Sequence, residues 1–118
     1  MDFETFRAYA LGKKGTSEDQ PFGEGALVFR VLRKIFAITD FNDHPLQVNL
    51  KCDPERAVEL RDRYEAVQPG YHMNKKHWNT VTFDGSIPER EVLAMIDHSY
   101  DLIVAGLKKK EREELAAL

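Results

Sequence analysis

Leu46-Gln47-Val48-Asn49-Leu50-Lys51-Cys52 is the clearest strand pattern in this chain, and the other elements of the fold follow from it. Its apolar and polar residues alternate strictly, so the apolar set faces one side of a strand and the amides and Lys51 face the other. Such alternation is typical of a sheet with one buried and one solvent-facing side. Asp53-Pro54 follows and predicts a helix start, with aspartate as the N-cap and proline at the first helical position.

The other elements are predicted outward from this strand. Strands rich in β-branched and aromatic residues are expected at Ala26–Leu32, Lys34–Thr39 and about Trp78–Phe83. Helices are expected at Asp2–Leu11, from Asp53-Pro54 to about Tyr64, and from Ser86-Ile87-Pro88 to Leu107, and the residues between Leu11 and Ala26 are expected to form a loop. Short turns between strands imply antiparallel pairing. The sequence therefore predicts an α+β two-layer sandwich, α-β(3)-α-β(2)-α, with helices covering one face of the sheet.

Length and composition limit the class of protein. The 118 residues predict one domain over 1–107 and a charged extension over 108–118, helical or frayed. With 42% hydrophobic and 31% charged residues, the chain is neither disordered nor a membrane protein. The acidic N-terminus does not resemble a signal peptide, and a single cysteine fits a reducing compartment. We expect a soluble cytoplasmic protein with no membrane partner.

Basic residues concentrate in the predicted strands. The segments 25–39, 46–52 and 71–83 contain no Asp or Glu, although the whole chain has a formal net charge of −3. Their cations are Arg30, Arg33, Lys34, Lys51, Lys75 and Lys76. One interpretation is that the uncovered face of the sheet is basic and binds a polyanion, because local potential governs such docking. The other is that strands simply disfavour acidic residues.

The run Tyr71–Asn79 is the densest polar and aromatic stretch. If Val81 and Phe83 face the core, alternation turns Lys76, Trp78, Thr80 and Thr82 outward. An outward Trp78 beside lysines can stack on an unpaired base while the ammonium groups contact phosphates. Alternatively, Trp78 packs beneath the last helix or a loop.

No residue pattern requires an enzyme, a metal or a cofactor. The spacing of His72 and His77 does not resemble a zinc site. Asp97-His98-Ser99 contains the residue types of a catalytic triad, but neighbouring helix positions point in different directions. The glutamates of the C-terminal extension are interpreted as a solvated acidic cluster, and Cys52 as a buried, inert thiol. We therefore expect a non-enzymatic protein without cofactor.

Several stretches resemble the MmcQ/YjbR family. They are Pro21–Gly25, Val28–Val31, Lys34–Ala37, the long block Pro69–Val81, and Ile96–Ile103. The resemblance implies an α+β fold similar in shape to secretion chaperones and frataxin-like proteins, and DNA binding through a double wing of β-hairpins. The chain departs from the family at Leu32-Arg33, where many members have a glycine in the turn. An arginine there could widen the turn or adopt a strained positive φ, and it would place a cation at a wing tip.

Three functional hypotheses follow. The first is weak, salt-sensitive binding of DNA or other nucleic acid, because few phosphates would be neutralised. Its predicted site consists of Arg30, Arg33, Lys34, Lys51, Lys75, Lys76 and Trp78. The alternative is a protein-interaction or chaperone-like module, suggested by the acidic helix after Asp53 and the charged extension. A frataxin-like metal binder rests on fold analogy alone. Either a monomer or a weak homodimer is compatible with the sequence.

Overall fold

Six antiparallel strands form one sheet, in the order β1-β2-β3-β4-β6-β5, in the computed structural model, which describes residues 1–118. The strands are β1 (Thr16–Asp19), β2 (Ala26–Val31), β3 (Lys34–Asp40), β4 (Leu46–Lys51), β5 (Val67–Pro69) and β6 (Trp78–Phe83). The helices are α1 (Phe3–Leu11), α2 (Pro54–Arg63), α3 (Glu89–Ala105) and α4 (Lys109–Ala116). The predicted α+β class and antiparallel pairing are confirmed.

The elements begin and end close to the predicted residues, for the predicted physical reasons. The Asp2 carboxylate accepts a hydrogen bond from the Thr5 amide at 2.8 Å and caps α1. Asp53 caps α2 in the same way, with Pro54 at its first position. The end of α3 is set by Gly106, whose amide closes the last turn. The capping signal of Asp53-Pro54 therefore placed the start of α2 correctly, whereas α3 ends at Ala105, two residues before the predicted Leu107.

Strand β1 is the element that the sequence analysis missed. Thr16–Asp19 was expected to be part of a loop, but it pairs with β2 from Thr16 opposite Val31 to Asp19 opposite Val28. Its sequence, Thr-Ser-Glu-Asp, has no apolar alternation and little strand propensity. Pairing with β2 holds it in the sheet, and its polar side chains suit an edge strand.

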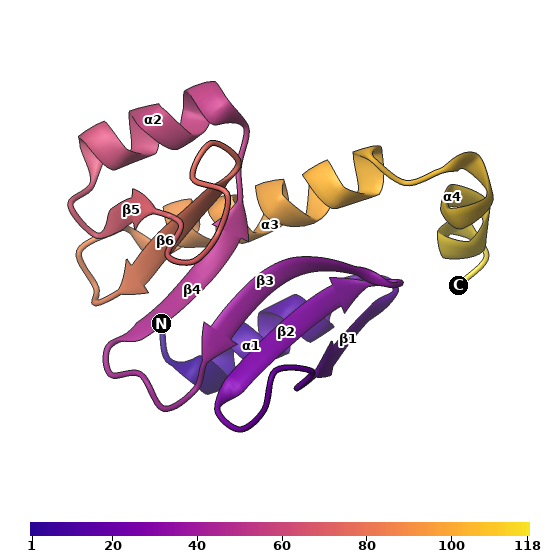
Figure 1. The fold of residues 1–118 in the computed structure, drawn as a ribbon, viewed down its shortest axis with the longest axis horizontal. Helices are drawn as coiled ribbons and strands as arrows, with labels where there is room; N and C mark the ends of the chain where they lie inside the picture. Colours follow the sequence, from indigo (N-terminus) through magenta and orange to yellow (C-terminus); the bar gives the residue numbers. More distant parts are fainter.

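The helices cover one side of the sheet. In Figure 1, α1 and α3 pass behind the strands. The register places Val48 of β4 opposite Thr39 and Val81, and these residues point toward the helices. The apolar residues on this side, together with those of all four helices, form one hydrophobic core of 22 buried residues. The alternation of Leu46–Cys52 therefore identified the buried side correctly.

The other side of the sheet, here called the open face, carries no helix. Ile38, Asn49 and Thr80 lie in register across β3, β4 and β6 and point to it. Figure 1 looks onto this side. The loop 70–77, between β5 and β6, folds back over part of it, because the Tyr71 amide donates a hydrogen bond to Thr80 Oγ1 at 2.9 Å. Thr80 was expected to face solvent; it points outward but is only 7% exposed beneath this loop.

The C-terminal extension is helical. Helix α4 packs back onto the domain through Leu115, which joins the hydrophobic core. Gly15 lies against the Leu115 side chain and has a positive φ of 74°, a backbone conformation that favours glycine. None of the four helices has the length and apolar character that crossing a membrane requires.

The turn between β2 and β3 has two residues, Leu32 and Arg33. The positive φ falls on Leu32, at 53°, rather than on Arg33. The hairpin keeps its tight turn, since Val31 still pairs with Lys34. The departure from glycine at this turn is therefore accommodated by a strained leucine and does not widen the loop.

Candidate functional site

The topology brings the predicted binding residues to one end of the sheet. In antiparallel order, β2 ends where β3 begins, and β4 ends where β6 begins, so all four of these termini share one end. We call this the basic end. It carries Arg30, Arg33, Lys34, Lys51, Lys75, Lys76 and Trp78.

The two arginines of the basic end are not free cations. Arg30 Nε lies 3.0 Å from Asp19 Oδ1 on the missed strand β1. Arg33 Nη2 lies 2.7 Å from Glu114 Oε2 and 3.5 Å from Glu111 Oε2, both on α4. The hydrogen bond from Arg33 holds the pKa of Glu114 below its usual value. The sequence analysis expected the acidic residues of the extension to form a solvated cluster. Two of them, Glu111 and Glu114, instead form ion pairs with Arg33.

The lysines of the basic end form no ion pair with any carboxylate. Lys75 Nζ donates to the Gly70 carbonyl at 3.0 Å, which leaves its charge uncompensated. Lys34, however, lies opposite the buried Val31 and so on the helix side of the sheet. It does not share a face with Lys51, contrary to the expectation of one basic surface. Lys51 is the free cation of the strands on the open side, and Lys75 and Lys76 are free cations of the loop 70–77.

Trp78 lies on the open face, directly opposite Lys51 in the β4–β6 ladder. It is half-buried, and it does not lie under α3, which covers the other side. The loop 70–77 passes close to it, since a Cβ on Gly70 would come within 2.9 Å of Trp78 Cβ. Trp78 thus points outward, as the alternation predicted, and its neighbour across the ladder is Lys51.

A hollow of about 700 Å³ extends over the open face. We call it the open-face hollow. Half of the residues that line it are hydrophobic. Its floor is the sheet itself, and its walls are three loops, 20–25, 41–45 and 70–77. The lining residues are Phe22, Ala26, Ile35, Ile38, Thr39, Asp40, Asp43, Gln47, Asn49, Tyr71, His72 and Met73.

Two aromatic side chains of the hollow are largely in solvent. Tyr71 is 70% exposed and Phe22 is 68% exposed. The Tyr71 ring contacts the ring of His72, with centroids 4.0 Å apart, and His72 has a positive φ of 58°. The sequence analysis did not propose either aromatic as a binding residue. Both residues lie in stretches rich in turn formers. A loop has no helix or strand periodicity, so the exposure of its side chains cannot be inferred from the sequence pattern.

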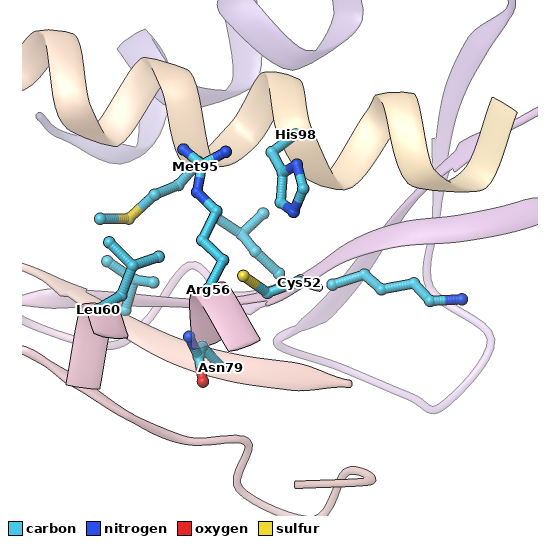
Figure 2. Close-up of a pocket in the computed structure, with 9 residues that line it drawn as sticks. Cys52, Arg56, Leu60, Asn79, Met95 and His98 are labelled. Carbon is cyan, nitrogen blue, oxygen red and sulfur yellow. The ribbon is translucent and has the colours of Figure 1, made fainter. Parts of the chain in front are cut away.

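A second, much smaller pocket lies between α2, α3 and the sheet, and Figure 2 shows its lining around Cys52, Arg56 and His98. Its volume of about 10 Å³ holds no more than one water molecule. Burial raises the pKa of the Cys52 thiol to about 11, which keeps it protonated and unreactive. Burial, together with the nearby Arg56 cation, lowers the pKa of His98. This pocket is a packing feature around a neutral histidine.

Asp97, His98 and Ser99 contact three separate parts of the molecule. Asp97 accepts hydrogen bonds from Tyr9 and Lys13 of the N-terminal segment. His98 Nε2 accepts from the Asp53 amide at 3.1 Å. Ser99 Oγ donates to the Phe36 carbonyl at 2.5 Å. The expectation that these residues cannot form a proton relay agrees with this geometry.

Comparison with known proteins identifies close relatives. A family model described as YjbR matches residues 11–102. The chain is 33% identical to protein YjbR of Escherichia coli over 118 residues, covering 100% of both chains. It is 36% identical to Escherichia coli protein YbdF over 112 residues, covering 95% of this chain and 92% of the other.

Solved structures have the same fold. A Deinococcus radiodurans protein superposes with a TM-score of 0.91 at 40% identity, covering 98% of this chain and 88% of that one. A Pseudomonas syringae protein superposes with a TM-score of 0.75 at 30% identity, covering 86% of this chain and 98% of that one. The α+β sheet with its helical cover is therefore common to these proteins.

Proposed function

This chain belongs to the YjbR family, and we propose that it binds nucleic acid through the basic end of its sheet. The observation that carries the proposal is local: Lys51 lies opposite the half-buried Trp78 in the β4–β6 ladder, Lys75 and Lys76 lie in the loop that leads into Trp78, and none of the three is paired with a carboxylate. Ammonium groups bind phosphate oxygens, and an indole provides a stacking surface for a base. Phosphate contact and base stacking are thus available within one small surface.

The proposed role is binding without catalysis. The ion pairs of Arg30 and Arg33 reduce the number of cations that can contact phosphates. Few contacts imply weak affinity and strong dependence on salt. The chain also has a net charge of −3, which opposes nonspecific accumulation on a polyanion away from the basic end.

The test is fluorescence anisotropy with labelled oligonucleotides at low salt. The variant is Lys75→Gln/Lys76→Gln, in which the shorter amide preserves polarity. We expect its affinity to fall about five- to thirtyfold, at about 0.5–1 kcal/mol for each exposed ionic contact. The control is Lys109→Gln/Lys110→Gln, which removes the same charge from exposed positions at the start of α4. Equal losses in both variants, or no binding by the unaltered chain, would contradict the proposal.

A second candidate is a protein-interaction module. The observation that favours it is the open-face hollow, where exposed aromatics stand beside apolar floor residues. Phe22→Ala would then abolish capture of a protein partner from nuclease-treated lysate, and the two glutamine variants would not. This dependence on Phe22 alone would separate the module from a nucleic-acid binder.

A further inference from the structure

We propose that the open-face hollow is a binding site for unpaired bases, so that the ligand is single-stranded nucleic acid; this inference rests on the proposed function. Phe22 and Tyr71 rise on loops before β2 and before β6, strands that are separated by β3 and β4. They therefore line the hollow from opposite sides, one beside β2 and the other beside β6. Exposed rings around a hollow can stack on bases, since every base has a π-face.

The floor of the hollow suits the flat, apolar face of a base. Ala26, Ile35 and Ile38 contribute apolar surface from β2 and β3. Beneath them, Val28 is completely buried, although it does not belong to the core of 22 residues under the helices. Val28 lies opposite Ile38 and points to the open side. The open face thus has a thin apolar layer of its own, which is unusual for a surface that only water contacts.

The polar groups of the hollow match the edges of bases. Asn49 Oδ1 accepts a hydrogen bond from Thr80 Oγ1 at 2.5 Å, which fixes the amide and leaves its NH₂ group available. The Gln47 side chain, two residues along β4, makes no hydrogen bond within the chain. Primary amides both donate and accept, as base edges do.

The distribution of charge selects an unpaired strand over a duplex. Asp40 and Asp43 line the hollow at the end opposite the basic end, while Lys51 lies two residues beyond Asn49 on β4. A duplex laid along this face would bring phosphates over the two carboxylates. A single strand can place its phosphates at the lysines and its bases over the hollow, where carboxylates accept hydrogen bonds from the N–H groups of unpaired bases, such as the ring N–H of thymine. The volume of about 700 Å³ falls within the size range of ligand pockets.

The experiment compares three labelled ligands of equal length at one salt concentration: oligo(dT), a duplex, and an abasic strand with the same phosphates. We expect oligo(dT) to bind at least tenfold more tightly than the other two. Tyr71→Ala should weaken binding of oligo(dT) roughly tenfold and leave the abasic strand unchanged. Tyr71→Phe should retain wild-type affinity, because stacking needs the ring alone. Val58→Ala, at an exposed apolar position on α2, is the control.

The outcomes separate this inference from the proposed function. Equal affinity for oligo(dT) and the abasic strand, or tighter binding of the duplex, would overturn the inference while nucleic-acid binding stood. The inference would also be overturned if Tyr71→Ala and Phe22→Ala left the affinity for oligo(dT) unchanged while Lys75→Gln/Lys76→Gln reduced it. If none of the three ligands bound, both the proposed function and this inference would be wrong. A protein partner would then be the remaining candidate ligand of the hollow.

Discussion

Ser99 resolves a local conflict between the sheet and the helix that covers it. A β-bulge shifts the pairing of β2 with β3 next to Phe36, and the last residue pair of β3 with β4 is Ala37 with Leu50. The Phe36 carbonyl and the Lys51 amide thus lie just past the end of the ladder. The Ser99 hydroxyl, which is fully buried on α3, donates to the Phe36 carbonyl at 2.5 Å and accepts from the Lys51 amide at 2.9 Å. One side chain therefore satisfies two buried backbone groups.

We predict that Ser99→Ala lowers the free energy of unfolding by about 2 kcal/mol, because both backbone groups would lose their partner. Urea denaturation followed by circular dichroism measures this change. Ser17→Ala, on the exposed side of β1, should change the stability by less than about 0.5 kcal/mol. A Ser99→Ala midpoint equal to that of Ser17→Ala would show that the hydroxyl is dispensable.

At the scale of elements, prediction from sequence succeeded where the signal was local. The strict alternation of β4 and the Asp-Pro start of α2 each depend on a few adjacent residues, and both were placed to within one or two positions. Strand β1 could not be found in this way. Its four polar residues become a strand because β2 offers an unpaired edge, which is a property of the folded sheet.

The candidate site was likewise predictable only where it depends on local sequence signals. Antiparallel order was enough to bring the strand-end cations together, since it follows from short turns. Neutralisation of Arg33 was not predictable, because Glu114 is 81 residues away and reaches it only when Leu115 anchors α4. The exposure of Tyr71 likewise depends on how the loop 70–77 returns over Thr80. Long-range packing, which leaves no periodic trace in the sequence, decides both.

Helix α4 therefore competes with any anion for Arg33. We predict that Glu114→Gln increases affinity for oligo(dT) about two- to fivefold, since it removes the nearer of the two carboxylates that hold Arg33, whose side chain is 63% exposed. Fluorescence anisotropy at low salt measures the change. Glu113→Gln removes the same charge from a neighbouring position without an ion pair and should have a smaller effect. Identical changes in the two variants would indicate a general effect of net charge and no competition at Arg33.

Across the whole molecule, the unpaired lysines of the basic end and the carboxylates that line the open-face hollow lie at different ends of the sheet. The chain is acidic overall, yet its unpaired lysines on the open side gather at one end of the sheet. The carboxylates of Asp40 and Asp43 lie toward the other end. A polyanion is therefore attracted in one orientation, and the attraction is confined to few charges.

The salt dependence of binding counts those charges. If only Lys51, Lys75 and Lys76 contact phosphates, the logarithm of the affinity for a single strand should fall with the logarithm of salt concentration with a slope of about −2, at about −0.7 for each contact. If Arg30, Arg33 and Lys34 also took part, the slope would be about −4. We expect the shallower value, because both arginines are held by carboxylates and Lys34 lies on the helix side.

In the variant Lys75→Gln/Lys76→Gln, only the contact of Lys51 remains. The slope should therefore be about −0.7. A slope near −4 that is the same in the double variant would contradict this prediction. It would mean that the phosphates bind at the β2–β3 hairpin, at Arg30 and Arg33, and not at the loop lysines.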